Sequence, residues 1–321
     1  MAIDGGILNR RIDKTPVAVI DLETTGLTPG IDRVVEVSVV RVEPGRKPYI
    51  AFDTLVNPQQ RVTATEIHGI TDRDVRSAPT FTEIAGDIVD AVSGCVIAAY
   101  NVYFDIKFLG YELERAGVSH LPPHFCLMYM RPLLELGPRC NLGQACRAHN
   151  IEQAAAHIAA FDAQASAKLL ACYFEVMAKR RISTYAELSR RKSYKFLKSF
   201  VNEPFSDSAS FSLCPSKRVV SRVALAPAVT VDPQRLAIQE YWDTLCTVLA
   251  DLEITNEEQA RMIEVRHRLK MPKEQVRMLH AKAFASVICQ FIEDRWLDDK
   301  EVRKLRRFFS CLSKLGWAPG E

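Results

Sequence analysis

Two carboxylates lie two residues apart at the end of an apolar segment near the N-terminus. Asp21 and Glu23 follow the apolar run 17–20 and precede Thr24-Thr25-Gly26-Leu27. Because alternate residues of a β-strand point to the same face, both carboxylates are expected on one side of the strand end. Two like charges at this separation repel each other unless a cation lies between them. The pattern therefore predicts a site for a hard divalent cation, Mg²⁺ or Mn²⁺.

Two later segments add two acids and a histidine. Asp105 follows Tyr100-Asn101-Val102-Tyr103-Phe104 and lies early in an expected helix. His157 and Asp162 are five residues apart, which is about 140° around a helix, so we expect His157 to precede the helix and Asp162 to lie within it. Four carboxylates and one imidazole suit a two-metal phosphodiesterase, in which the acids hold the cations and the imidazole activates water.

These three segments together resemble the DEDD-type 3′→5′ exonucleases of the histidine subtype. That family includes the proofreading (epsilon) subunit of bacterial DNA polymerase III, RNase T and oligoribonuclease, and the resemblance covers roughly residues 15–180. It implies two bound divalent cations, Mg²⁺ or Mn²⁺, and a histidine general base. The implied metal ligands are Asp21, Glu23, Asp105 and Asp162, and the implied base is His157.

The resemblance also implies contacts to the terminal nucleotide. The matching residues are Thr24, Leu27, His68, Asn101 and Phe104. The ring of Phe104 suits stacking on a base, since every base has a π-face. His68 has a second interpretation, as a residue that only caps a turn. Tyr100 departs from the pattern, because proofreading subunits commonly carry His there; this position is not a metal ligand, so the departure concerns substrate preference.

The implied reaction is hydrolysis of the last phosphodiester at the 3′ end of single-stranded or frayed DNA, which releases a nucleoside 5′-monophosphate. An exoribonuclease of the same chemistry is an alternative, because the motifs do not show whether the pocket accepts a 2′-hydroxyl. A non-catalytic interaction protein is a second alternative, and the intact acid and histidine set argues against it. The expected partners are nucleic-acid 3′ ends, DNA rather than RNA, and a protein that binds residues 236–321, but no membrane.

Composition sets the limits of these interpretations. At 321 residues and 48% hydrophobic, the chain can bury the cores of more than one domain. The net charge of +3 is by itself no sign of nucleic-acid binding, and an enzyme that works on chain ends does not need a broad basic surface. The nine cysteines are scattered without a Cys-x-x-Cys pair, which argues against a disulfide framework or a zinc site. Without a signal peptide or an apolar run of membrane-spanning length, a cytoplasmic protein is expected.

The hydrophobic pattern predicts an α/β fold: a ribonuclease-H-like mixed five-stranded sheet flanked by helices, followed by a linker and a small all-helical domain. The expected strands are 16–22, 34–42, 49–56, 95–100 and 124–127. The expected helices of the first domain are 81–92, 102–116, 140–149 and 159–179. Because the links are short, the first three strands should form an antiparallel meander. The predicted divisions are a polar leader (1–14), an exonuclease domain (15–182), a basic segment with a flexible linker (183–235) and a helical domain (236–321).

The basic segment allows two interpretations. Residues 190–200 interleave Arg and Lys with Tyr194, Phe196 and Phe200, a combination that can hold a nucleic-acid backbone and stack bases. The alternative, which we favour, is a solvated linker helix with a few apolar anchors. Residues 203–230 are rich in Ser, Pro and Ala and are expected to be flexible.

The C-terminal part contains an internal repeat in which each copy is a helix, an acidic turn and a second helix, and a helix near 273–283 connects the copies. The matched pairs include Tyr241 with Phe284, Leu245 with Ile288, and Cys246 with Cys289. Capping boxes are expected at Thr255-x-x-Glu258 and Asp298-x-x-Glu301. The acidic turns lack the EF-hand pattern, so capping is favoured over calcium binding. The repeat resembles the tellurite-resistance-B-like helical domains, which implies a partner-binding or targeting module.

Overall fold

The computed structural model describes residues 6–153, 157–191, 194–202, 205, 219–222, 232–250, 252–291 and 299–318. Its contacts divide the chain into two compact units. We call residues 1–25, 33–63 and 70–229 the sheet unit, and residues 26–32, 64–69 and 230–321 the helical unit. Among the described residues, no helix is long and apolar enough to cross a membrane.

The sheet unit is built on five strands in the order β3-β2-β1-β4-β5. They are β1 (Val17–Thr24), β2 (Val34–Val42), β3 (Tyr49–Leu55), β4 (Val96–Ala99) and β5 (His124–Cys126). Strands β1, β2 and β3 form the predicted antiparallel meander, and β4 and β5 run parallel to β1. The central strand β1 begins with the buried apolar run 17–20, which places it in the middle of the core. The predicted ribonuclease-H-like mixed sheet is confirmed.

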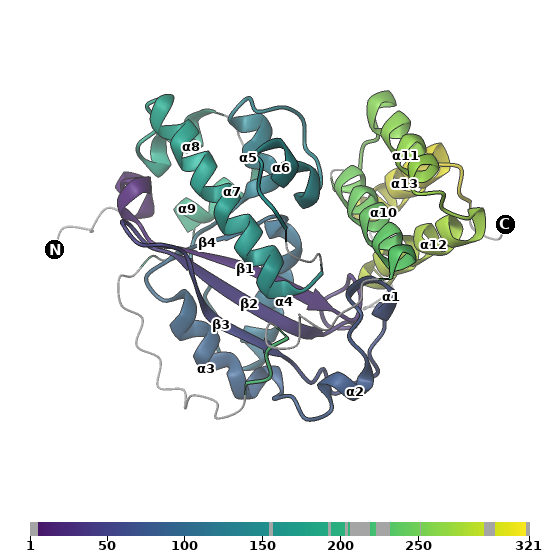
Figure 1. Ribbon diagram of the computed structural model, residues 1–321, viewed down its shortest axis with the longest axis horizontal. Coiled ribbons are helices and arrows are strands. Elements are labelled where there is room, and N and C mark those ends of the chain that lie inside the picture. The colour runs from purple at the N-terminus through teal and green to yellow at the C-terminus, as the bar shows by residue number, and fades with distance from the viewer. Residues whose placement is uncertain are drawn as a thin grey trace. The chain divides into compact units, whose positions relative to one another are not determined.

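Helices cover both faces of this sheet (Figure 1). Helix α7 (Ala159–Lys179) packs on β1 and β2, and α3 (Phe81–Val92) lies across the opposite face and contacts α4 (Val102–Arg115). The other helices of this unit are α2 (Asp72–Val75), α5 (Leu127–Leu133), α6 (Leu142–Ala148), α8 (Tyr185–Arg191) and α9 (Ser199–Asn202), with 3-10 turns at Ile7–Asn9, Ile12–Lys14 and Lys195–Lys198. Helices α3, α4, α6 and α7 match the prediction, and α8 lies in the segment expected to form a linker helix. Helices α2, α5 and α9 were not predicted; α2 and α9 have four residues each, too few for a periodic pattern.

Two segments expected to be outside the fold belong to its core. Ile7 and Ile12 of the polar leader are 1% and 4% exposed and join the main hydrophobic cluster. In the basic segment, Tyr185 and Phe200 are buried with their ring centroids 5.1 Å apart. The segment is therefore packed on the sheet unit, where a solvated linker helix was expected.

Part of the expected flexible linker is also docked on the sheet. The backbone N–H of Leu55 donates to the carbonyl of Val220 at 2.8 Å, and the N–H of Val220 donates to Thr54 Oγ1 at 2.9 Å. Residues 219–222 are thus hydrogen-bonded to the end of β3, where a flexible chain was expected. Apart from these and Phe205, residues 203–231 lie outside the described part of the chain.

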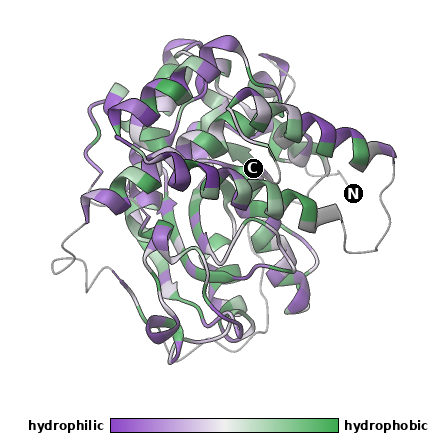
Figure 2. Ribbon diagram, turned by 90° about the vertical axis from the view of Figure 1, so that its right-hand side faces the viewer, coloured by the Kyte–Doolittle hydropathy of each residue, from purple (hydrophilic) through white to green (hydrophobic). Residues whose placement is uncertain are grey.

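The helical unit contains α10 (Pro233–Leu249), α11 (Asn256–Arg268), α12 (Lys273–Phe291), α13 (Asp299–Lys314) and the short α1 (Thr65–His68). Helix α10 contacts α11, and α12 contacts α13. The helices carry hydrophobic and hydrophilic residues on different faces (Figure 2), and Tyr241, Leu245 and Leu312 are among those that form the core. The capping box at Thr255 is confirmed, whereas the one expected at Asp298 falls outside the described residues.

Two features of this unit differ from the sequence interpretation. The expected connecting helix and the first helix of the second copy form one continuous helix, α12, because no Pro or Gly interrupts residues 273–291. The unit also includes residues 26–32 and 64–69, from the range expected to be nuclease. Ile67 explains the second difference, because it joins the apolar cluster of the helices and its carbonyl accepts a hydrogen bond from Gln239.

Candidate active site

Strands β1 and β2 place three carboxylates on one face of the sheet. Asp21 and Glu23 alternate along β1, and Glu23 lies directly opposite Glu36 of β2 in the antiparallel pairing. The pairing register shifts immediately after Glu23, so the strand becomes irregular where the acids end. Glu23 is 9% exposed and Glu36 is fully buried. An apolar strand thus delivers acidic side chains into the interior.

Two helix N-termini bring the remaining acids to this face. Asp105 lies in the first turn of α4 and is 5% exposed, and Asp162 lies in the first turn of α7 and is 7% exposed. Carboxylates near helix N-termini are favoured by the helix dipole. The charge of each of these two carboxylates raises the pKa of Asp21, so all three belong to one electrostatic cluster.

His157 lies before α7, as the spacing predicted. The backbone N–H of His157 donates to Asp162 Oδ2 at 2.8 Å, and Gln153 Nε2 donates to the other oxygen of that carboxylate. The ring atom Nδ1 of His157 is 3.7 Å from Glu23 Oε1. His157 has φ +58°, in the left-handed region that non-glycine residues rarely occupy. Such conformations are enriched at functional sites, where the surroundings hold the residue in place.

The electrostatics of the cluster explain what it can bind. Loss of hydration, followed by the charges of Asp162 and Asp105, raises the pKa of Asp21 well above its usual range. Burial raises the pKa of Glu23 to about 8, against the opposing effect of His157. Burial also raises the pKa of Asp105 to about 8. At neutral pH these acids cannot all ionise side by side without a compensating cation.

The donor atoms fit such a cation. One oxygen each from Glu23 and Asp162 and one ring nitrogen of His157 lie within 4.8 Å of one another. Carboxylate oxygens are the ligands that hard divalent cations prefer. The arrangement suits metal-assisted hydrolysis, in which acids hold the ions and an imidazole transfers a proton.

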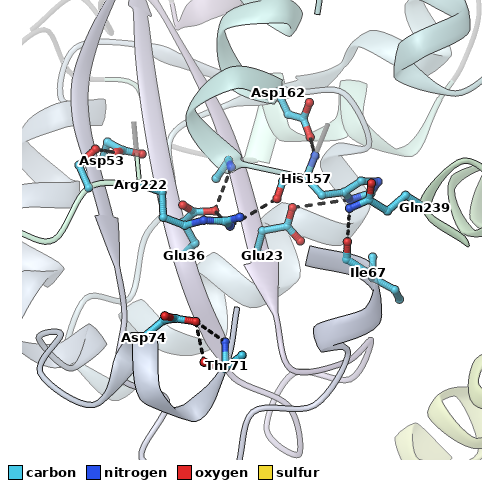
Figure 3. Close-up of polar contacts among 12 residues, drawn as sticks. Glu23, Glu36, Asp53, Ile67, Thr71, Asp74, His157, Asp162, Arg222 and Gln239 are labelled. Atoms are coloured by element: carbon cyan, nitrogen blue, oxygen red, sulfur yellow. Dashed lines mark hydrogen bonds and ion pairs between the residues drawn. The ribbon is translucent and has the colours of Figure 1, made fainter. Parts of the chain in front are cut away.

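The ion pair between Arg222 and Glu36 was not predicted from the sequence. Arg222 Nη1 donates to Glu36 Oε2 at 2.9 Å and to the carbonyl of His157 at 3.4 Å. Glu36 Oε2, which faces Arg222 in Figure 3, also accepts from the backbone N–H of Ala159 at 3.0 Å. Glu36 could have been found as the one charged residue in the apolar run 34–40. Nothing in the sequence pointed to Arg222, which lies in a Ser- and Pro-rich segment.

The residues expected to contact a nucleotide are divided between the two units. Thr24 at the end of β1, Asn101 at the N-cap of α4 and Phe104 in its first turn belong to the sheet unit with the acids. Leu27 and His68 belong to the helical unit, where His68 is 1% exposed.

Two aromatic side chains near these acids have packing roles. Tyr100 is buried and its hydroxyl donates to the carbonyl of Cys140 at 2.6 Å, which is a packing role. The Phe104 ring is partly buried, with its centroid 5.0 Å from that of Phe108. Tyr100 therefore packs in the core. Phe104 also packs in the core, but part of its ring is exposed.

Residues 18–170 match the family model described as Exonuclease. These residues form an exonuclease domain of the DEDD type. All five residues of the predicted catalytic set, Asp21, Glu23, Asp105, His157 and Asp162, lie within it, and metal binding is expected for this family. The resemblance seen in the sequence is confirmed for this domain, and the resemblance of residues 236–321 to tellurite-resistance-B-like domains stays a prediction.

Several known proteins are similar to the exonuclease domain. The PolC-type DNA polymerase III of Lactococcus lactis subsp. lactis is 30% identical over 166 residues, which are 50% of this chain and 10% of that protein. The DNA polymerase III subunit epsilon-like protein of Rhodobacter capsulatus is 41% identical over 102 residues, 30% of this chain and 14% of that one. The chain thus spans about a seventh of the length of these curated relatives, or less.

A solved structure is similar at lower identity. The zinc-bound complex of E. coli ExoI with single-stranded DNA has a TM-score of 0.43 and 14% identity, covering 94% of this chain and all of that one.

Proposed function

We propose that the protein is a metal-dependent 3′→5′ exonuclease that hydrolyses the terminal phosphodiester of single-stranded or frayed DNA. The observation that carries this proposal is the convergence of four acids and one histidine at the end of β1 inside an exonuclease domain. The relatives reported above are DNA polymerase III proteins, which favours DNA over RNA.

The acids would hold two divalent cations, Mg²⁺ or Mn²⁺. Bound there, the cations would polarise the scissile phosphate and stabilise the negative charge that develops on the attacking and leaving oxygens. Asp21, Glu23, Asp105 and Asp162 are the ligands in this proposal. The raised pKa values of Asp21, Glu23 and Asp105 support it, because burial disfavours their charged forms and a bound cation would compensate those charges.

His157 would act as the general base. A neutral imidazole can accept the proton of the attacking water on a ring nitrogen. The carboxylate of Glu23, 3.7 Å from Nδ1, would favour the imidazolium that results. The hydrogen bond from the His157 N–H to Asp162 links the base to a metal ligand, so both are held in one geometry.

The terminal nucleotide would contact residues at the end of β1 and at the start of α4. Thr24, Asn101 and Phe104 are the proposed contacts there, with the partly exposed Phe104 ring stacking on the base. Leu27 and His68 stay contacts that the resemblance alone predicts.

A gel assay tests the proposal directly. Single-stranded DNA and RNA of the same sequence, labelled at the 5′ end, are incubated with the protein and Mg²⁺ or Mn²⁺. We expect a ladder that shortens from the 3′ end on DNA, and none with Asp21→Asn, which preserves the shape of the side chain. A ladder on RNA alone would assign the protein to RNA instead. Absence of cleavage with both metals would refute the exonuclease proposal.

A further inference from the structure

Residues 219–222 are docked beside the candidate active site. The backbone of Val220 is hydrogen-bonded to β3, and its side chain packs on the apolar cluster that includes Val35 and Leu55. The hydroxyl of Ser221 donates to the carboxylate of Asp53. These contacts hold the chain in place immediately before Arg222, so the backbone from which the Arg222 side chain extends is fixed.

The guanidinium of Arg222 reaches into the interior from this segment. Its side chain is 14% exposed and that of its partner Glu36 is 1% exposed. The Glu36 oxygen that accepts from Arg222 also accepts from the N–H of Ala159, the first residue of α7. Glu36 thus satisfies one of the free N–H groups at the start of the helix that carries Asp162. Arg222 neutralises a carboxylate that caps the catalytic helix.

The same guanidinium contacts the proposed general base. The carbonyl of His157 accepts from Arg222 Nη1, and the N–H of His157 donates to Asp162 (Figure 3). The backbone of His157 is therefore held on both sides while it adopts φ +58°. A non-glycine residue keeps this conformation only when its surroundings impose it. The Arg222 contact is one of the hydrogen bonds that hold this backbone.

We propose that Arg222 is a positioning residue of the nuclease. It holds the His157 carbonyl directly and holds the start of α7 through Glu36, and both contacts orient the imidazole relative to the metal ligands. Arg222 does not touch the substrate in this proposal, so its removal should slow proton transfer without weakening substrate binding. This role rests on the proposed function, because it requires His157 to act as the base.

The first test compares two partly buried arginines. Arg41 is a matched control: it is 17% exposed, pairs with Glu43 at 3.1 Å and donates to the carbonyls of Ala91 and Ser93, but it lies at the far end of β2. We expect Arg222→Met to lower kcat on single-stranded DNA by about 10–100-fold, the range measured for supporting residues of metal sites, with KM changed less than about twofold. Arg41→Met should leave kcat within about twofold of the wild type.

A conservative substitution of Arg222 adds a further control. Arg222→Lys retains a cation that can reach Glu36, so it should recover part of kcat. If Arg222→Met kept wild-type kcat, or if Arg41→Met lowered kcat as far, the positioning role would be refuted. A fall in kcat shared by both variants would indicate a general loss of stability instead.

A double-mutant cycle separates positioning from neutralisation. Glu36→Gln removes the buried charge but keeps an oxygen that can accept from Ala159. If Arg222 holds His157, Arg222→Met should still lower kcat about tenfold when it is added to Glu36→Gln. If kcat returned to within about twofold of Glu36→Gln alone, Arg222 would serve only to neutralise Glu36, and the proposal would fall.

A chemical measurement tests the geometry without relying on catalysis. Diethyl pyrocarbonate modifies accessible neutral imidazoles, and mass spectrometry gives the rate for the peptide that contains His157. In metal-free protein we expect Arg222→Met to speed this modification severalfold and Arg41→Met to leave it unchanged. Equal rates in the wild type and Arg222→Met would contradict the positioning role. If the wild type had no nuclease activity, the proposed function would fail while this measurement still reported on the His157 peptide.

Discussion

The two units differ in the polar groups that they bury. The sheet unit buries Glu23, Glu36 and Asp105 in one cluster, and burial raises the pKa of Glu23 and of Asp105 to about 8. The helical unit buries His280, whose Nε2 lies 2.9 Å from the hydroxyl of Tyr241. Burial lowers the pKa of His280 to about 4. The first unit keeps a repulsion that a cation can relieve, whereas the second buries a neutral, hydrogen-bonded pair.

This difference distinguishes a cluster that binds a ligand from a core that only stabilises the fold. A buried hydrogen-bonded pair stabilises the unit that contains it, and it needs no further ligand. A buried cluster of like charges destabilises the free protein and is retained where it binds something. The same comparison predicts that the two units respond to pH in opposite directions.

The largest expected effect is on catalysis in the sheet unit. Asp162→Asn should lower kcat by roughly 10³-fold, since it removes a charged ligand from a site expected to supply several kcal/mol. Asp90→Asn, at an exposed acid of α3, is the matched control and should retain wild-type kcat. Both are measured with 5′-labelled single-stranded DNA at saturating Mg²⁺. Full activity in Asp162→Asn would place the catalytic acids elsewhere.

The second prediction concerns the stability of the metal-free sheet unit. The folded-state pKa values of Glu23 and Asp105 lie above the ordinary values of 4.5 and 3.8, so the folded state binds more protons and loses stability as pH rises toward 8. We expect a loss of about 1–3 kcal/mol between pH 5 and 8. Hydrogen exchange of β1 and β2 peptides in chelator measures it.

Two further measurements test whether the buried acids cause this loss of stability. Glu23→Gln should reduce the loss, because it removes one of the titrating groups. Saturating Mg²⁺ should abolish it, because the cation replaces the proton as the compensating charge. Stability of β1 that increased with pH in chelator would show that the cluster does not have raised pKa values.

The third prediction is the opposite dependence in the helical unit. His280 has an ordinary pKa of 6.5 and a folded-state pKa of about 4, so the unfolded state binds more protons and stability falls as pH drops from 6.5 to 4. We expect a loss of about 1–3 kcal/mol over this window. All three tryptophans lie after residue 240, so urea unfolding followed by tryptophan fluorescence reports on this unit.

Its control uses a second histidine of the same unit. His280→Phe should remove the pH dependence, because no titrating group remains in the core position. His267→Asn, at an exposed histidine of α11, should leave the dependence unchanged. A dependence that survived His280→Phe would assign the effect to another group.

The smallest expected effect is on an ion pair within the helical unit. Lys282 Nζ lies 2.6 Å from Glu66 Oε1, and the two side chains are 24% and 36% exposed. Because partly exposed pairs contribute little, Lys282→Met should lower the free energy of unfolding by about 1 kcal/mol or less. Tryptophan fluorescence again measures it, with Lys273→Met as a control at the start of α12. A loss well above this value would show that residues 64–69 are held mainly by this pair.

The relative placement of the candidate site residues could be predicted from their spacing along the sequence. Asp21 and Glu23 lie two residues apart on a strand, so both point to the same face. His157 and Asp162 are five residues apart and cannot share one face of a helix, so His157 was expected before the helix. The strands, the antiparallel meander and α3, α4, α6 and α7 were predicted for the same reason. Helices α2 and α9 were missed because a single turn does not establish a period, and α5 was also not predicted.

Long-range pairing could not be predicted in this way. Arg222 is 186 residues from Glu36, and Gln239 is 172 residues from Ile67. Composition suggested a flexible linker around Arg222, yet backbone hydrogen bonds to β3 and the buried carboxylate of Glu36 hold it in place. No periodicity encodes such pairs, because they depend on which distant surfaces meet after folding.

The sequence alone identified the candidate catalytic residues, because strand alternation and helix spacing act over a few residues. It also determined a second helical part, because the repeat and the Thr255 capping box are local patterns. Two features became visible only in the folded chain: the loops with Leu27 and His68 pack with the helices, and Arg222 reaches the backbone of His157. The reason is physical: buried charges and hydrogen-bonding groups need partners, and in the folded chain those partners are far apart in sequence.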